Sequence, residues 1–148
     1  MTFTIAQNDN VASLSALKLA PAYAFTSLNP VTFVAGYDWD VIDFLEESAQ
    51  LTDESADTDN GLQFTYNLIF AFNKKRADLL ASAAPYLGTV GIAMVTDMNG
   101  LTQIIGTLQS PITLKQNGDT GKVMGDMNNV LYTALVVQDV AAIIVSPL

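Results

Sequence analysis

The clearest pattern in the chain is a regular alternation of side chains between residues 62 and 72. Successive side chains of a strand point to opposite faces, so this alternation predicts a strand with one apolar face. The apolar face holds the even positions: Leu62, Phe64, Tyr66, Leu68, Phe70 and Phe72. We expect Phe64, Leu68 and Phe70 to be buried, because aromatic and aliphatic side chains of this size remove a large apolar area from water.

A helix is expected directly after this strand, over Asn73–Ala84, as the only helix longer than two turns. Asn73 is the predicted N-cap, since its side chain can accept a hydrogen bond from a free amide of the first turn. Apolar side chains then recur at helical spacing, at Ala77, Leu80, Ala81 and Ala84. Pro85 cannot continue the helix and therefore ends it.

The third local signal is Asn99-Gly100, which follows an apolar run from Thr89 to Asp97. This dipeptide is typical of a two-residue hairpin turn of type I′, in which both residues have positive φ. Such a turn fixes the register of the two strands. The predicted partners are Met98 with Leu101, Thr96 with Gln103, and Val95 with Ile104.

Further strands are predicted before and after this central region. They cover Thr2–Ala6, Val31–Ala35, part of Tyr37–Leu45, Pro111–Leu114, Asn129–Gln138 and Val140–Val145, while Val11–Ala20 fits a strand or a helix. Turn residues at Asn117-Gly118 and Thr120-Gly121 separate two of them. Residues 46–60 are polar and acidic and are expected to form a long exposed loop or hairpin. The whole is predicted to be a single domain, residues 1–148, with a β-sandwich or barrel of about eight to ten antiparallel strands and one flanking helix.

Composition adds an expectation of assembly. Hydrophobic residues make up 50% of the chain and charged residues only 14%, against about 25% charged residues in a typical soluble domain. Either much of the surface is polar and neutral, or much of it is buried between subunits. We favour burial between subunits because uncharged apolar strands are so numerous.

Several kinds of chemistry find no support in the sequence. The chain contains no cysteine and no histidine, so it lacks thiolate chemistry and the commonest general base and metal ligand. The segment Asp57–Gly61 is similar to a calcium loop, but its glycine comes one place early and Leu68 stands where a bidentate glutamate is needed. We expect no enzyme activity, no cofactor and no bound metal. No signal peptide or apolar run long enough for a membrane span is found, so a soluble protein made in the cytoplasm is expected.

The charges are unevenly distributed. Nine of the fifteen acids lie between Asp38 and Asp59, where there is no base, whereas three of the six bases are consecutive. These bases, Lys74, Lys75 and Arg76, oppose the dipole at a helix start, so helix stability does not explain them. They are either a solvated helix start or a partner for acids of a neighbouring subunit. On the second hypothesis, the interface comprises Lys74, Lys75, Arg76, Glu46, Glu47, Asp53 and Glu54, and an acidic face toward a channel or solvent comprises Asp38, Asp40, Asp43, Asp57 and Asp59.

The order of elements from Asn60 to Val145 resembles a group of small structural proteins of phages and prophages of Bacteroidetes-like bacteria. The resemblance rests on five features of this sequence. They are the aromatic strand Gly61–Phe72, the basic start Asn73–Arg76 with its alanine-rich continuation, Val90–Asp97 with Asn99-Gly100, Ile104–Thr107 ahead of Ser110-Pro111, and Thr120-Gly121 before Asp126 and Asn128. Residues 1–60 carry no resemblance.

The resemblance implies a virion protein, most similar to a major tail tube protein, whose subunits form stacked hexameric rings around a channel for DNA. Its partners are then other copies of itself and other phage tail proteins, while DNA passes without specific binding and no membrane is involved. Residues 46–60 are the candidate for the loop between rings. An acidic lining fits such a channel because it repels phosphate. The alternatives are a head decoration or neck protein, or another β-sandwich binding module such as a carbohydrate-binding domain.

Overall fold

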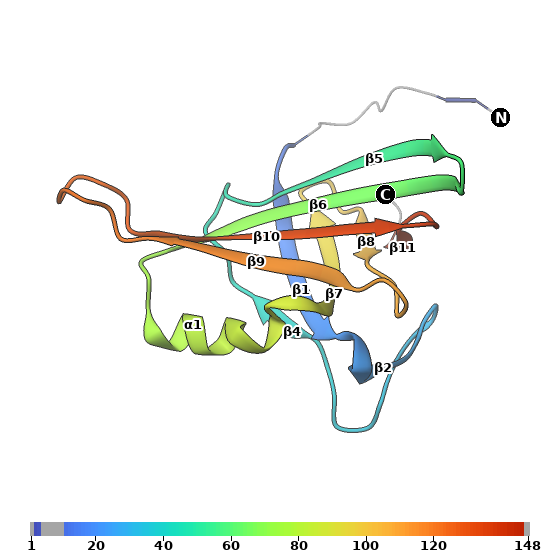
Figure 1. The fold of residues 1–148 in the computed structure, drawn as a ribbon, viewed down its shortest axis with the longest axis horizontal. Helices are drawn as coiled ribbons and strands as arrows, with labels where there is room; N and C mark the ends of the chain where they lie inside the picture. The colour runs from blue at the N-terminus through green and yellow to red at the C-terminus, as the bar shows by residue number, and fades with distance from the viewer. Residues whose placement is uncertain (1, 4–10, 147–148) are drawn as a thin grey trace.

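The protein is described here by a computed structural model that places residues 2–3 and 11–146. Figure 1 shows a mainly β structure with one short α-helix. The strands are β1 (Leu14–Pro21), β2 (Phe25–Leu28), β3 (Val31–Phe33), β4 (Asp40–Ile42), β5 (Gln50–Thr58), β6 (Gly61–Asn73), β7 (Gly88–Asp97), β8 (Thr102–Ile105), β9 (Ile112–Asp119), β10 (Asn129–Gln138) and β11 (Ile143–Ser146), and the helix is α1 (Ala77–Ala83). Two 3-10 turns cover Ala22–Ala24 and Ala84–Tyr86.

The predicted fold class is confirmed: nine of the strands form one antiparallel sheet, and β2 and β3 form a small second one. The described part of the chain holds eleven strands rather than eight to ten, because β2, β3 and β4 are separate strands of three or four residues. Val11–Ala20, left open between strand and helix, contributes most of β1. The strand expected over Thr2–Ala6 lies largely outside the described residues.

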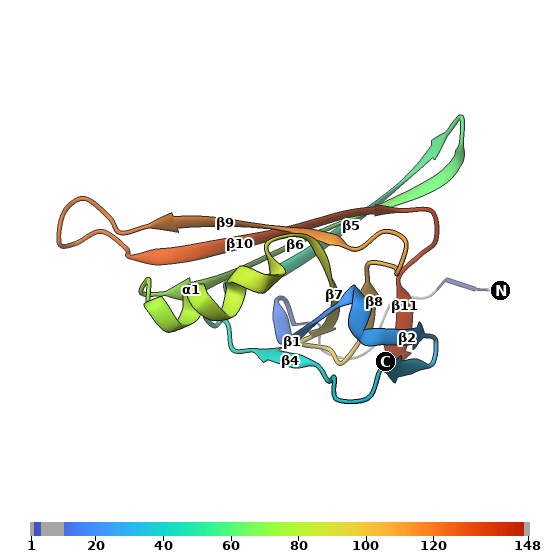
Figure 2. The ribbon, with the colours of Figure 1, turned by 60° about the horizontal axis from the view of Figure 1, so that its bottom comes forward.

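The strand β7 turns the nine-stranded sheet into two layers. Its first residues, Gly88–Gly91, pair with β9, its later residues pair with β8, and β1 pairs along its other edge. In Figure 2 the strands β9, β10, β6 and β5 form an upper layer, and β1, β4, β7, β8 and β11 lie below them. Apolar side chains of both layers share one core, in which Leu17 and Val95 from below meet Leu68 from above.

The central strand β6 agrees with the prediction in its middle and departs from it at its start. Leu68 and Phe70 are buried, as expected, but Phe64 is only partly buried and Leu62 is 52% exposed. The reason is that the β5–β6 hairpin extends past the lower layer, so no element of the described residues packs beneath its tip (Figure 2). The prediction that Phe64 is buried is therefore wrong, while that for Leu68 and Phe70 is confirmed.

The helix begins later than expected. Asn73 is the last residue of β6, where it pairs with Asn129, and Lys74 has a φ of 62°. The residue before the first helical residue is Arg76, which makes no capping hydrogen bond with its side chain. The β6–β10 ladder therefore keeps the chain extended up to Asn73, and the predicted cap is wrong. Leu79, Leu80 and Ala83 pack against the core, so the helix flanks the sheet on its inner face.

The β7–β8 hairpin has a different turn from the predicted one. Thr96 pairs with Thr102, one position away from the predicted partner Gln103. This register places Asp97 opposite Leu101, so the loop has three residues, Met98, Asn99 and Gly100, instead of two. Of these three only Gly100 has positive φ, at 98°, whereas a type I′ turn needs two such residues. The carboxylate of Asp97 accepts hydrogen bonds from the amides of Asn99 (2.9 Å) and Leu101 (3.0 Å), which stabilises this longer turn.

Two long hairpins extend from opposite ends of the upper layer (Figure 2). The acidic residues 50–58 form β5, which pairs with β6 along its whole length, so this region is a hairpin and not a loop. The second hairpin, β9–β10, is longer than predicted, because Asn117 and Gly118 are paired with β10 and do not form a turn. We refer to residues 115–132 as the β9–β10 arm and to residues 120–128 as its tip.

Candidate assembly surfaces

The upper layer ends in two open strand edges. β5 pairs only with β6, over all of its nine residues. At the other side β9 pairs with β7 only near Ile112–Leu114, so residues 115–119 have no second partner strand in the described part of the chain. Each open edge presents unpaired backbone N–H and C=O groups that can pair with a strand of another chain.

The outer face of the upper layer is also uncovered. Figure 2 shows no element of the described chain above β9, β10, β6 and β5. The positions on this face have the opposite parity to the buried ones and are mainly small, polar or aliphatic, including Thr52, Thr65, Asn67, Thr113, Asn117, Thr133, Leu135 and Val137. Charges are few on it, with Glu54, Lys115 and Asp119 as examples. The face is therefore broad, nearly neutral and free of a covering helix.

The three consecutive bases lie in a loop between β6 and α1, which we call the basic loop (Lys74–Arg76). The amide of Lys74 donates to the backbone carbonyl of Asn128 (2.7 Å), and the amide of Lys75 donates to the side-chain oxygen of Asn128 (3.0 Å). A Cβ atom at Gly118 would lie 3.3 Å from the Nζ atom of Lys75, so this side chain crosses directly over β9. The basic loop is thus fixed beside the β9 edge, and its description as a helix start is wrong.

The predicted acidic partners lie elsewhere in the same chain. Glu46 and Glu47 precede β5 and lie near the end of β6, where the amide of Leu45 donates to the carbonyl of Ala71. Asp53 and Glu54 lie within β5, and Asp57 and Asp59 lie at the far tip of the β5–β6 hairpin; all of these side chains are exposed. The tip is separated from the basic loop by the 13 residues of β6, or roughly 40 Å at the rise of a strand.

Consequently the structure does not bring the bases and acids of one chain together. In the described residues the one ion pair is between Arg76 and Asp78, with 3.7 Å between Nε and Oδ1, and both side chains are exposed. The roughly 40 Å between the basic loop and the hairpin tip is several times the screening length of about 8 Å at physiological salt, so Asp57 and Asp59 do not pair with these bases within one chain. Glu46 and Glu47 lie at the same end of the upper layer as the basic loop, on its β5 side, and make no ion pair with it among the described residues.

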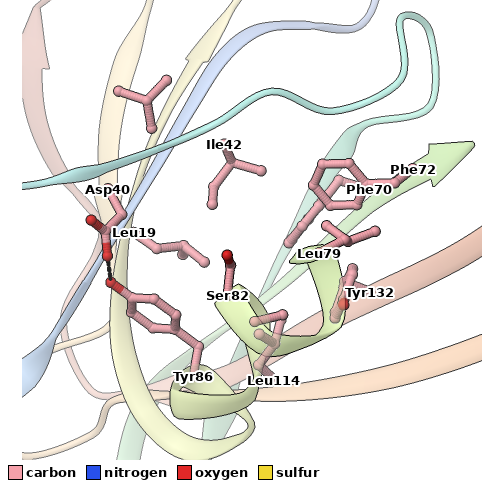
Figure 3. A pocket seen from close by; sticks show the side chains of 12 residues that line it. Leu19, Asp40, Ile42, Phe70, Phe72, Leu79, Ser82, Tyr86, Leu114 and Tyr132 are labelled. Atoms are coloured by element: carbon pink, nitrogen blue, oxygen red, sulfur yellow. Dashed lines mark hydrogen bonds between the residues drawn. The ribbon is translucent and has the colours of Figure 1, made fainter. Parts of the chain in front are cut away.

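The remaining acids of the predicted set lie on the lower layer, around β4. The carboxylate of Asp38 accepts a hydrogen bond from the amide of Trp39 (2.7 Å), and Asp43 is exposed just after the strand. Asp40 accepts a hydrogen bond from the hydroxyl of Tyr86, as the dashed line in Figure 3 shows. Burial raises the pKa of Tyr86, and the hydrogen bond and the charge of Asp40 raise it further. The phenol is thus held neutral as a donor, which does not suit it to act as a nucleophile or base.

Asp40 and Tyr86 border a pocket of about 400 Å³ between α1, β4 and the upper layer. Its lining is mainly apolar: Leu19, Val41, Ile42, Phe70, Phe72, Leu79, Ala83, Leu114 and Tyr132, with Ser82 near the opening (Figure 3). The volume falls in the range of about 300–1,000 Å³ that is usual for binding pockets. Sequence patterns gave no indication of it, because its walls come from six segments that are far apart along the chain.

Within the described residues no group of three or more aspartate or glutamate side chains is arranged to hold a metal ion. The segment Asp57–Gly61 is a hairpin turn, in which the Thr58 hydroxyl donates to the Gly61 carbonyl (2.7 Å). None of the helices described in this chain combines the length and the apolar character needed to cross a bilayer.

Comparison with protein-family models, with curated proteins and with solved structures found no significant match. The assignment of a function therefore rests on the geometry of these surfaces and on the resemblance described above.

Proposed function

We propose that this protein is a structural protein of a phage virion, the subunit of a tail tube that assembles into stacked hexameric rings. The observation that carries the proposal is the pair of open strand edges on the upper layer, at β5 and at residues 115–119 of β9. The upper layer is a sheet with two unpaired sides, and pairing between copies satisfies both of them.

The directions of the strands favour closure into a ring. The order β9-β10-β6-β5 is antiparallel throughout, so β5 runs opposite to β9. Across the ladders Gln50 of β5 lies level with Lys115 of β9, so β5 and residues 115–119 occupy successive levels along the strands. When identical subunits are related by a rotation that keeps the strand direction and staggers neighbouring copies along the strands, as the strand tilt of a closed sheet does, β5 of one copy meets β9 of the next as an antiparallel pair. Such a contact uses two different patches of each subunit, and contacts of this kind form rings when the rotation closes.

The charges favour this pairing over self-pairing of like edges. Two β5 strands side by side would bring Asp53, Glu54 and Asp57 close to the same acids of the partner, and like charges across strands are destabilising. The β9 edge instead carries one base and one acid, Lys115 and Asp119, and lies beside the basic loop. Glu46 and Glu47 flank the β5 edge at the end of the layer where the basic loop flanks the β9 edge, so side-by-side copies bring opposite charges together.

In this ring the uncovered outer face of the upper layer lines the channel. Its threonine, asparagine and aliphatic side chains offer few cations to phosphate, and the chain has a net charge of −9. Passage of DNA without tight binding is consistent with that, since phosphate contacts by lysine and arginine supply most non-specific affinity. Asp38, Asp40 and Asp43 belong to the lower layer and face outward in this arrangement, so they are not part of the channel lining.

Negative-stain electron microscopy of the purified protein tests the proposal. We expect rings or tubes with a central channel, and fewer of them at high salt because the flanking charge contacts are exposed. Monodisperse compact monomers at all protein and salt concentrations would contradict it.

The alternative of a carbohydrate-binding module has one observation in its favour. Tyr23 and Tyr37 are 67% and 44% exposed, and their ring centroids are 5.8 Å apart. The two rings meet edge to face at 81°, however, and thus do not form one flat stacking surface. A glycan-binding assay in which Tyr23→Ala abolishes binding would favour this second function over the tube.

A further inference from the structure

The tip of the β9–β10 arm exposes apolar side chains far from any core. Val123 is 64% exposed, Met127 is 57% exposed and Met124 is fully exposed. In Figure 2 the tip is the most remote point of the arm, beyond the start of α1. Clustered apolar side chains in such a place are typical of a surface that contacts another molecule.

The backbone of the tip is held in shape by its own hydrogen bonds. The carboxylate of Asp126 accepts from the amides of Lys122 (2.9 Å) and Val123 (3.0 Å), and the amide of Asp126 donates to the carbonyl of Val123 (3.0 Å). At the base of the tip Gly121 donates to the carboxylate of Asp119 (2.9 Å). A tip that is already ordered loses less conformational entropy when it binds.

The pocket between α1 and β4 of a second copy of this chain is a suitable binding site for the tip. It is mostly apolar inside, and its rim includes Val41, which is 73% exposed. Asp40 is the one charged residue that lines the pocket, and Asp38 and Asp43 lie two residues before it and three after it in the same segment. The paired strand carries one base, Lys18, opposite Val41. The opening is thus apolar with an acidic border.

We propose that the tip of one copy inserts Val123 and Met124 into this pocket of a second copy. Lys122, directly before them, then lies beside the acidic border formed by Asp38, Asp40 and Asp43. Methionine suits such a contact because its flexible side chain adapts to irregular apolar space. The tip does not reach the pocket of its own chain, because the arm points away from α1 and β4 (Figure 2).

This contact is distinct from the edge pairing of β5 and β9 and uses a different part of the subunit. It joins two unlike patches, so each copy both donates a tip and accepts one. It rests on the proposed function only in that it requires several copies to assemble.

Disulfide trapping tests the contact directly, because the chain has no cysteine of its own. The variant Met124→Cys/Ser82→Cys places one thiol on the tip and one at the pocket opening, both at exposed positions. The matched control is Met98→Cys/Ser82→Cys, in which the first thiol lies on the exposed β7–β8 turn. With diamide as oxidant we expect a ladder of cross-linked multimers for the first variant. Thiols held together at millimolar effective concentration react on the order of a thousandfold faster than thiols that meet at micromolar concentration.

Equal cross-linking of the two variants would overturn the contact. A second pair, Val123→Cys/Val41→Cys, repeats the measurement at neighbouring positions, and circular dichroism verifies that each variant is folded. Electron microscopy of the wild type separates the two proposals. Rings or tubes without the specific ladder reject the tip–pocket contact and leave the tail tube proposal, whereas a ladder without rings or tubes does the reverse.

Charge insertion gives an independent measurement without oxidation. Met124→Glu places a carboxylate into an apolar pocket with an acidic border, so we expect loss of the contact and a lower sedimentation coefficient of the assembled protein. Met98→Glu is the control with the same change on another turn. Sedimentation of Met124→Glu identical to that of Met98→Glu and the wild type would count against the contact.

Discussion

The centre and the edges of the upper layer are built from very different sequences, although they belong to one sheet. Every second residue of β10, from Val130 to Gln138, is buried, whereas no residue of β5 is buried. Both strands are nevertheless paired over their full length. The centre is stabilised by apolar burial and by two backbone ladders, while the edge has one ladder and charged side chains.

The two regions therefore differ in whether their backbone is available to a partner. A polar edge strand does not collapse onto its own core, and its charges disfavour pairing with an identical edge. The backbone groups of β5 and of the outer part of β9 remain open for a strand of opposite character.

Substitution by proline is expected to have the most different effects in the central strand β10 and in the edge strand β5. Thr133→Pro lies in β10, which is paired on both sides, so we expect a protein that does not fold, because proline lacks a ladder donor. Ser55→Pro lies in the edge strand β5 and is expected to fold but not to assemble into rings or tubes. Circular dichroism reports folding and electron microscopy reports assembly. Ser55→Thr is the control, and wild-type assembly of Ser55→Pro would show that the β5 edge is not an interface.

Truncation of side chains gives the next largest contrast. Phe70→Ala in the core is expected to lower the free energy of unfolding by about 3–5 kcal/mol, since it leaves a cavity. Glu54→Ala on β5 is expected to change it by no more than about 0.5 kcal/mol, as is usual for surface positions. Phe64→Ala falls between them because Phe64 is only partly buried. Urea titrations measure all three, and a melting temperature of Phe70→Ala within a degree or two of wild type would contradict the core assignment.

The hydrogen bond between Tyr86 and Asp40 contributes less and depends on pH. Tyr86→Phe removes it and is expected to cost about 0.5–1.5 kcal/mol at pH 7. The pKa of Tyr86 is raised in the folded protein, so above pH 10, the ordinary pKa of tyrosine, the unfolded chain loses this proton while the folded chain keeps it. Wild-type stability therefore falls as pH rises through that range, and the difference from Tyr86→Phe narrows.

Urea titrations of both proteins at pH 7 and pH 11 measure this difference. Burial also raises the pKa of Tyr132, but both proteins contain that residue, so its contribution cancels in the comparison. A difference that is the same at the two pH values would show that Tyr86 does not retain its proton in the folded state.

The smallest expected effect on folding comes from the basic loop. Replacing Lys74, Lys75 and Arg76 by glutamate should leave the monomer folded, because exposed ion pairs contribute only about 0–1 kcal/mol each. Assembly should be impaired, since every interface repeats the same contact and charge also selects orientation. Replacement by glutamine is the control that removes charge without reversing it. Particles of the glutamate variant with wild-type salt sensitivity would leave the basic loop as a solvated surface.

The β class and the strands at the centre of the upper layer are predictable from the sequence alone. β10 has the predicted bounds, Asn129–Gln138, and Leu68 and Phe70 of β6 are buried as expected. These elements were predictable because a strand buried on one face needs apolar side chains at every second position. The period is therefore imposed by the core and appears in the sequence wherever a strand crosses it.

Elements without a buried face show no alternation of apolar side chains in the sequence. The strand β5 and residues 115–119 of β9 are polar, and only their ladders with β6 and β10 make them strands. The turn after Asp97 has three residues because the Asp97 carboxylate binds two amides of the turn, a contact that the Asn99-Gly100 pair alone does not reveal. The basic residues follow the end of a ladder at Asn73, whereas their sequence is equally compatible with a helix start.

The candidate surfaces depend on tertiary structure for the same reason. The sequence contained the bases, the acids and the apolar residues of the tip, but not their relative positions. Pairing of β7 with β1, β8 and β9 sets the two layers against each other, and this places α1 and β4 around one pocket. Contacts between distant segments are set by strand register and layer packing, and a local period in the sequence carries no information about either.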